Sequence, residues 1–312
     1  LDATNAYGLL VENEKDLAGI PADDIESFKE TAQAANQEGY RITLQVPHYL
    51  AVMQYADNRS LRETLYHAYV TRASEFDFDA KFNNNDVMKR IVKLRAQEAA
   101  LLGYRNYGKV SLATKMAKTP QEVVAFLRDL AAKSLPQAKT DMAEVKAFAK
   151  EKLGIDDPQS WDLPYASEKL RQARYAYSDQ EVKQYFTLPA VFKGLFGLVQ
   201  KLFGIRIVKD TAPVWHPDVQ FFRIENANGE KIAQFYMDLY ARPNKRGGAW
   251  MDNDRTRNRL YGALQTPVAY LVCNFAKPVG DKPALLTHDD VLTLFHEFGH
   301  GLHHMLSRIE EP

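Results

Sequence analysis

Residues 287–306 read THDDVLTLFHEFGHGLHHML, and His296 and His300 in this stretch are four positions apart. In a helix, His296 and His300 would lie on one face, about one turn (roughly 6 Å) from each other, so both imidazoles could reach one cation. Glu297 directly follows the first histidine, where its carboxylate can take a proton from a metal-bound water. The H-E-x-x-H spacing therefore predicts the zinc site of a hydrolase, with His296 and His300 as metal ligands and Glu297 as catalytic base.

A helix start signal precedes this motif. Thr287 is followed three residues later by Asp290, which is the spacing of a capping box, and the apolar run 291–295 comes next. Inside the helix, Gly299 and Gly301 each lower helix propensity by roughly 1 kcal/mol. We expect close packing, rather than a direct role in function, to require these two glycines.

A catalytic zinc ion takes three protein ligands and keeps a fourth position for water, so His296 and His300 need a third protein ligand beside them. His303 lies seven residues after His296, roughly 10 Å further along a straight helix, which is too far for a shared ion. The metzincin spacing fails as well, because Gly301 comes too early and Leu306 stands where the third histidine would be. We interpret His303 and His304 as surface residues or supports of the ligands, and we expect the third ligand elsewhere.

The wider sequence resembles the thimet-oligopeptidase family of zinc peptidases, in particular its bacterial members. The resemblance is carried by THDDVLTLFHEFGHGLHHMLSRIE (287–310), FYMDLYARPNKRGGAWM (235–251) and PVAYLVCNF (267–275), and it extends over essentially the whole chain. It implies that His296 and His300 bind zinc and that Glu297 is the base. It also implies one zinc ion per complete protein, with a third ligand, a glutamate on a following helix, beyond Pro312. We therefore expect residues 1–312 to be the middle part of a longer protein and to be inactive alone.

For the fold, we expect a mainly α, zincin-like helical metallopeptidase fragment with a small antiparallel β-sheet beside the H-E-x-x-H helix. We divide the chain into a helical domain, 1–165, and an incomplete catalytic part, 166–312. The resemblance implies that the first forms one wall of a deep channel, which admits short peptides and excludes folded proteins.

Apolar residues at spacings of three and four predict amphipathic helices in much of the chain. Pro136 falls inside the longest of them, where we expect a kink or break. The predicted helices are Asp24 to Gln37, Leu61 to Ala73, Asn85 to Leu102, Pro120 to Leu153, Glu168 to Tyr177 and Glu181 to Phe203.

Strand signals appear further along the chain. Phe221 to Ile224 and Ile232 to Tyr236 flank Asn228-Gly229, a dipeptide typical of a tight hairpin. Val268 to Cys273 is apolar without alternation, as in a strand covered on both faces. A substrate peptide could add as an extra strand to an edge within 219–275, or these strands could only support the helix; the sequence leaves both open. The run 245–248 (KRGG) reads as a flexible loop that either lines the channel or is a solvated turn.

Composition excludes several functions. Lys plus Arg and Asp plus Glu are both 40, so no net charge favours nucleic acid or a membrane surface as a partner. No apolar stretch approaches the roughly 18 residues of a membrane span. Cys273 is the single cysteine and lies in an apolar run, which favours a reducing, cytoplasmic location and argues against a thiol nucleophile.

Two functions remain open at this point. The first is a zinc-dependent endopeptidase, a monomer that hydrolyses short oligopeptides. The second is a non-catalytic peptide-binding or scaffold protein that lacks a complete zinc site. The intact triplet His296, Glu297 and His300 favours the enzyme. We interpret His48 and His67 as ordinary structural or surface histidines, and His216 is too weakly placed to be a ligand.

Overall fold

The computed structural model describes residues 1–176, 178–260, 262–280 and 283–311. About half of these are helical, and the strands form one two-stranded antiparallel sheet and one five-stranded mixed sheet. The predicted helical character is thus confirmed in part. The Tyr177 end of the helix predicted from Glu168 lies outside the described residues.

The chain forms two compact units. One consists of Leu1, Gly8–Ala51 and Arg174–Pro312, and the other of Asp2–Tyr7 and Val52–Ala173. The predicted division into 1–165 and 166–312 stays a prediction, and residues 8–51 belong to the same compact unit as Arg174–Pro312. Long-range contacts explain this grouping, since Lys183 forms an ion pair with Asp23 and the Gly280 amide donates to Glu30. The proposed role of 1–165 as a channel wall stays a prediction.

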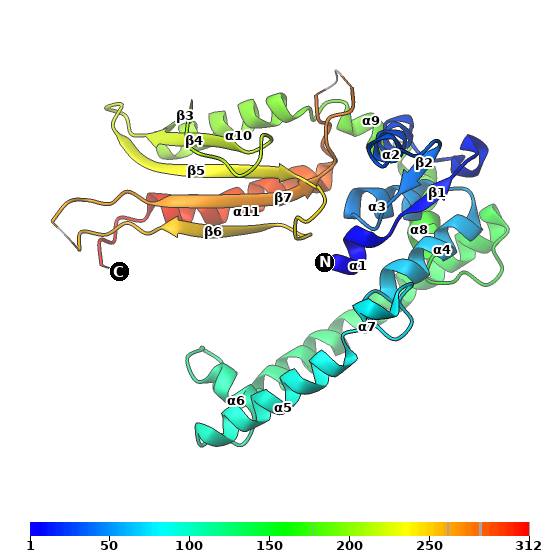
Figure 1. Cartoon of the computed structure of the whole chain (residues 1–312), viewed down its shortest axis with the longest axis horizontal. Helices are drawn as coiled ribbons and strands as arrows, with labels where there is room; N and C mark the ends of the chain where they lie inside the picture. Colours follow the sequence, from blue (N-terminus) through cyan, green and yellow to red (C-terminus); the bar gives the residue numbers. More distant parts are fainter. Residues whose placement is uncertain (177, 261, 281–282, 312) are drawn as a thin grey trace. The chain divides into compact units, whose positions relative to one another are not determined.

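The second unit is helical. It contains the helices α1 (Asp2–Ala6), α4 (Arg59–Val70), α5 (Asn85–Leu101), α6 (Tyr107–Leu112), α7 (Pro120–Leu153) and α8 (Leu163–Tyr175), whose last two residues belong to the other unit, and the 3-10 turn η2 (Ala80–Phe82). Thr119 caps the start of α7 and Gly154, with φ of 68°, ends it. Of the kink or break expected at Pro136, the break does not occur, because α7 is one helix along its length (Figure 1). A proline removes one intrahelical hydrogen bond, and the turns on either side of it are long enough to continue.

The amino-terminal part of the first unit is a small subdomain. It holds β1 (Leu9–Val11) and β2 (Tyr40–Ile42), paired antiparallel, together with η1 (Glu14–Leu17), α2 (Ala22–Ala34) and most of α3 (Val46–Tyr55). His48 lies in this subdomain, where its Nδ1 accepts from the Thr43 amide and its Nε2 contacts the Ser27 hydroxyl. It is therefore a structural histidine, as predicted.

The rest of the first unit is built on the five-stranded sheet. Its strands lie in the order β3 (Arg206–Asp210), β4 (Gln220–Glu225), β5 (Lys231–Tyr240), β7 (Val268–Phe275) and β6 (Trp250–Arg255). The hairpin predicted at Asn228-Gly229 is confirmed as β4 and β5, and Gly229 has the positive φ, 80°, that its turn requires.

The sheet is mixed rather than antiparallel, which corrects the predicted sheet type. β5 and β7 pair in parallel, whereas every other neighbouring pair is antiparallel. The reason is the chain path. β6 runs opposite to β5 but does not pair with it, and β7 runs opposite to β6 and lies between the two, so β7 is parallel to β5. β7 thus pairs with a strand at each edge, and, as a separate feature, most of its side chains are buried.

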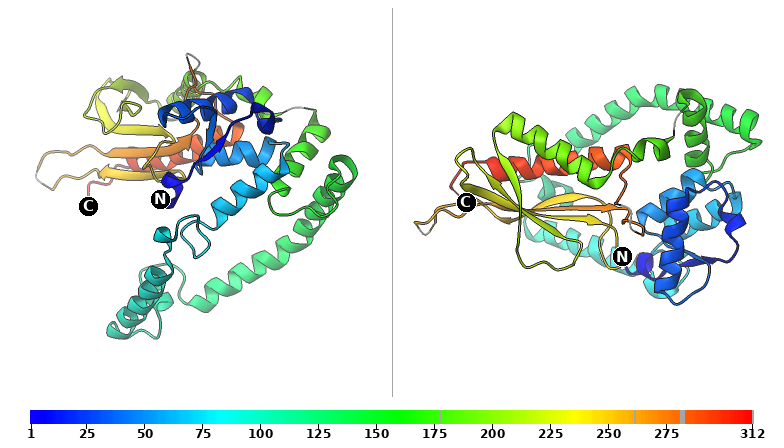
Figure 2. Two further views of the ribbon diagram at one scale, coloured as in Figure 1. Left: turned by 45° about the vertical axis from the view of Figure 1, so that its right-hand side comes forward. Right: turned by 90° about the horizontal axis from the view of Figure 1, so that it is seen from above.

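Helices cover one face of this sheet and complete its core (Figure 2). The predicted helix 181–203 is in fact two, α9 (Asp179–Lys183) and α10 (Leu188–Phe203), because Thr187 caps a new start with Pro189 in its first turn. The last helix, α11 (His288–Leu306), packs on β7 and contributes Leu294, Phe298, Leu302 and Met305 to the core.

The predicted capping box at the start of α11 is present. The Asp290 amide donates to Thr287 Oγ1 at 3.1 Å, and the Thr287 amide donates to the Asp290 carboxylate at 2.9 Å. Such a cap contributes about 1 kcal/mol and fixes where the helix begins. Because α11 carries the histidine motif, this start and the packing on β7 together set where the motif lies relative to the sheet.

Candidate metal centre

The two histidines of the motif converge. His296 Nε2 and His300 Nε2 are 3.1 Å apart, and their rings are nearly perpendicular, at 87°. Two nitrogens bound at about 2.0–2.1 Å to one tetrahedral zinc ion would be about 3.3 Å apart. The same contact also allows a hydrogen bond in which one neutral ring donates to the other. The donor pair therefore fits a shared zinc ion, and metal binding is the measurement that separates the two interpretations.

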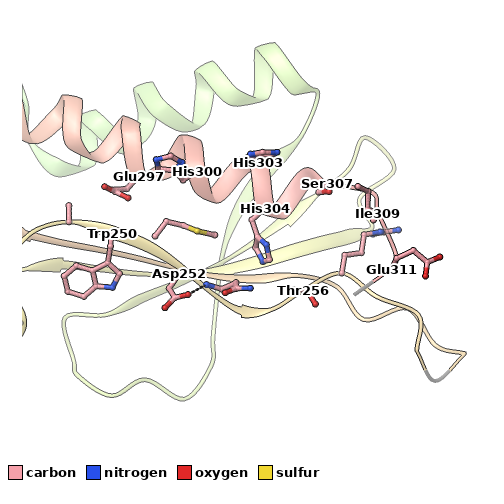
Figure 3. Close-up of a pocket in the computed structure, with 14 residues that line it drawn as sticks. Trp250, Asp252, Thr256, Glu297, His300, His303, His304, Ser307, Ile309 and Glu311 are labelled. Atoms are coloured by element: carbon pink, nitrogen blue, oxygen red, sulfur yellow. Dashed lines mark hydrogen bonds between the residues drawn. The ribbon is translucent and has the colours of Figure 1, made fainter. Parts of the chain in front are cut away.

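Glu297 lies on the sheet side of α11. Its side chain is buried, and it lines a cavity of about 720 Å³ together with His300. The cavity is bounded by α11, by β6 and by the segment that follows the helix, as Figure 3 shows. A carboxylate that points into a cavity beside an imidazole is in a position to accept a proton from a bound water.

His303 and His304 do not join the pair. His303 is exposed, and His304 Nε2 donates to the main-chain oxygen of Arg255 at 2.9 Å. Among the residues that the structure describes, no group of three or more His, Cys, Asp or Glu side chains is arranged to hold one ion. Two other histidines lie apart from the motif: His67 packs against Trp161, and His216 Nδ1 accepts from the Asp218 amide.

The family of this chain follows from its similarity to known proteins. The profile described as "Peptidase family M3" matches residues 52–312. The chain belongs to this family. The M3 chain is 51% identical to oligopeptidase A of Escherichia coli (strain K12) over 99% of its own length and 46% of the relative's. It is also 43% identical to the organellar oligopeptidase A of Arabidopsis thaliana, covering 41% of that protein, and 36% identical to dipeptidyl carboxypeptidase of Escherichia coli, covering 45%.

These matches confirm the family resemblance found in the sequence. The M3 chain spans about half the length of the curated relatives that it matches. In the described part of the chain, no helix combines the length and the apolar character needed to cross a membrane.

One strand beside the cavity of this M3 chain could not be found from the sequence. β6 is the last strand of the sheet, and within the residues that the structure describes it pairs with β7 alone, which leaves its other edge open. Its sequence, WMDNDR, is mostly polar and exposed, and it lacks the alternation that marks a half-buried strand. The apolar run of the neighbouring β7 indicates burial of both faces of that strand, but it does not predict that a further strand pairs with its edge.

The loop before β6 differs in part from its prediction: positions 246–248 are exposed, as in a solvated turn, but Lys245 is not. The run 245–248 was predicted to be flexible, but the Lys245 side chain is 5% exposed and its Nζ donates to Asp238 Oδ1 and to the Tyr240 main-chain oxygen. Burial raises the pKa of Asp238, but hydrogen bonds from Arg242, Lys245 and Trp215 outweigh it and lower that pKa to about 2. Asn274 also donates to the main-chain oxygens of Arg246 and Gly248. Buried polar side chains thus anchor this loop.

Cys273 lies on β7 and is buried. Burial, followed by the nearby charge of Glu297, raises the pKa of its thiol to about 12. The thiolate that a nucleophile needs is therefore disfavoured, as the sequence indicated.

Proposed function

We propose that this chain carries the metal-binding helix of a zinc-dependent endopeptidase that hydrolyses short oligopeptides. The observation that supports it most is the convergence of His296 Nε2 and His300 Nε2 beside the buried carboxylate of Glu297, in a chain of peptidase family M3. Its relatives include proteins named oligopeptidase A and dipeptidyl carboxypeptidase. Peptide hydrolysis is the chemistry that this set of side chains fits.

In this proposal His296 and His300 hold the zinc ion, which when bound supplies a Lewis acid for water and for the scissile carbonyl. Glu297 accepts the proton of the attacking water and then transfers it to the departing amine. Its place on α11, one residue after a ligand, gives the base a fixed distance from the reacting atoms. The core around Phe298, which immediately follows Glu297 in the chain, keeps this turn of the helix rigid.

The third ligand is proposed to be a glutamate that follows Pro312 in the complete protein. Two observations support a further segment on α11. The helix face that carries His296 and His300 is exposed, and Leu292 on the same face is 55% exposed. A Cβ added to Gly299, on that face, would meet open space: apart from the backbone of its own helix and its two chain neighbours, no atom of the described residues lies within 4 Å.

We place the substrate backbone along the open edge of β6. This edge borders the cavity that Glu297 and His300 line, and its unpaired main-chain groups can bond an extended peptide with little demand on side-chain sequence. The other possibility raised by the sequence, that strands only support the helix, describes β7 better, since α11 packs directly on it. The channel, the monomeric state and the cytoplasmic location stay predictions.

The test uses zinc analysis and peptide cleavage by the complete protein and by residues 1–312. We expect near one zinc ion per complete chain, cleavage of a quenched-fluorescent peptide, and no cleavage by residues 1–312. Glu297→Gln should retain zinc and lower turnover by about 100- to 10,000-fold, because only the base is removed. A complete protein that neither binds zinc nor cleaves peptides would favour the scaffold function, and unchanged turnover of the Gln variant would remove Glu297 from its role.

A further inference from the structure

His304 makes a contact that the proposed chemistry does not use. It lies one turn after His300 on α11, and its Nε2 donates to the main-chain oxygen of Arg255, at the end of β6. Figure 3 shows its ring pointing from the helix toward the strands. The hydrogen bond joins the helix that carries the metal ligands to the strand with the open edge.

The end of β6 is irregular at this point. Asn253 pairs with Ala269 and Arg255 with Val268, so Asp254 is an extra residue in the strand. Such a bulge bends an edge strand and weakens its pairing locally. The Asp254 carboxylate is held by the Tyr270 hydroxyl at 2.8 Å, and His304 binds the main chain one residue later. The strand end is therefore fixed by two side chains where its ladder is interrupted.

We propose that His304 is a positioning residue that fixes the end of β6 relative to the His296 and His300 pair. The inference rests on the proposed placement of the substrate along β6. If a peptide pairs with this edge, the spacing between strand and helix sets which of its carbonyl groups meets Glu297. A single hydrogen bond across the cavity is well placed to maintain that spacing, because no strand in the described part of the chain pairs with the other edge of β6.

The neighbouring histidine provides a matched control. His303 is on the same helix, lines the same cavity and is exposed, but it makes no hydrogen bond within the described part of the chain. Both residues are histidines on the same helix, so replacing each by alanine removes the same chemical group. The difference between the two variants isolates the contact with Arg255.

The hydrogen bond from His304 to the Arg255 main-chain oxygen is tested by hydrogen exchange, which does not depend on catalysis. In the complete protein, His304→Ala should speed exchange of the amides that pair β6 with β7 near Arg255 by about fivefold, the effect of one typical hydrogen bond. His303→Ala should leave these rates unchanged, and His304→Gln, which keeps a donor, should restore part of the protection. Equal exchange in the His304→Ala and His303→Ala variants would show that the hydrogen bond from His304 to Arg255 does not hold the end of β6.

The positioning role is tested with two quenched peptides that share one cleavage site. One is short, and the other extends several residues further on each side, so that it pairs with more of β6. His304→Ala should lower kcat/KM about fivefold for the long peptide, mainly through KM, and change it little for the short one. An equal loss on both peptides would indicate general damage and reject the positioning role. If the parent protein cleaves neither peptide, the proposed function is wrong. The exchange experiment would still show whether the His304 hydrogen bond holds the end of β6.

Discussion

Gly301 of α11 lies directly against Leu271 of β7. A Cβ built on Gly301 would be 3.0 Å from Leu271 Cδ2, closer than side chains normally pack. At Gly299, two residues earlier, a Cβ would meet open space among the described residues, beyond the backbone of its own helix and its chain neighbours. Close packing therefore explains Gly301, as expected from the sequence, but it does not explain Gly299 in this chain. Because Gly301 has no side chain, α11 packs close to the sheet at this point, and Glu297 on the same helix lines the cavity.

The two glycines should respond differently to alanine in residues 1–312. Gly299→Ala should raise the free energy of unfolding by up to about 1 kcal/mol, because helix propensity improves and nothing is displaced. Gly301→Ala should lose roughly 1 kcal/mol, since overpacking against Leu271 exceeds the gain in propensity. Urea denaturation measures both. Equal effects of the two substitutions would show that the contact with Leu271 does not constrain the helix.

Removal of either proposed ligand should release the metal. In the complete protein, His296→Ala and His300→Ala should each reduce bound zinc from near one ion to less than about a tenth, because one imidazole cannot hold the site alone. His303→Ala, one turn further along the helix, should keep zinc at the parent level. Elemental analysis after gel filtration gives the stoichiometry. Full zinc retention by both ligand variants would show that the imidazole pair is not the metal site.

His48 should make the stability of the first unit depend on pH. Burial lowers the pKa of its imidazole to about 4, below the usual 6.5. Between these values the unfolded chain binds a proton that the folded chain excludes, so stability falls as the pH decreases from about 6.5 toward 4. The loss should be on the order of 1–3 kcal/mol. Denaturation of residues 1–312 at several pH values measures it.

The matched variant for this prediction is His48→Gln, which has no titratable group. Its curve of stability against pH should be flatter in the same window, although Gln lowers stability at neutral pH by disturbing the contacts with Thr43 and Ser27. Parallel curves for parent and variant would assign the pH dependence to other groups.

Lys245 should matter more than its neighbour Arg246. Lys245→Ala should destabilise the chain by about 2–3 kcal/mol, because Asp238 loses one of its two cationic partners and the Lys245 Nζ contacts in the loop are lost. Arg246 is exposed, so Arg246→Ala should change stability by less than about 0.5 kcal/mol. Urea denaturation of the pair provides the comparison. A difference below about 0.5 kcal/mol would mean that the buried ion cluster does not stabilise the loop.

Local signals predicted much of this structure. The start of α11 at Thr287, the helical placement of the histidine pair and the hairpin at Asn228-Gly229 all depend on residues within one or two turns of the chain. The convergence of His296 and His300 follows from the same local periodicity. Such features can be inferred without knowledge of what lies elsewhere in the molecule.

The features that sequence reasoning missed depend on distant residues. β6 is a strand only because β7 pairs with it, and the parallel pairing of β5 with β7 is set by the order in which the chain fills the sheet. The buried state of Lys245 depends on Asp238 and Tyr240, which lie on the preceding strand. Residues 8–51 group with the sheet through contacts such as Lys183 with Asp23.

The position of β7 between β5 and β6 also bears on the synthesis of the protein. A ribosome produces β5 and β6 first, so β5 emerges with one edge unsatisfied until the chain reaches β7, which then inserts between strands already made. Pairing of this kind is slow and leaves apolar strand edges accessible during elongation. Nascent chains whose part outside the ribosome ends between residues 256 and 267 should therefore be the ones most prone to aggregate and most dependent on chaperones.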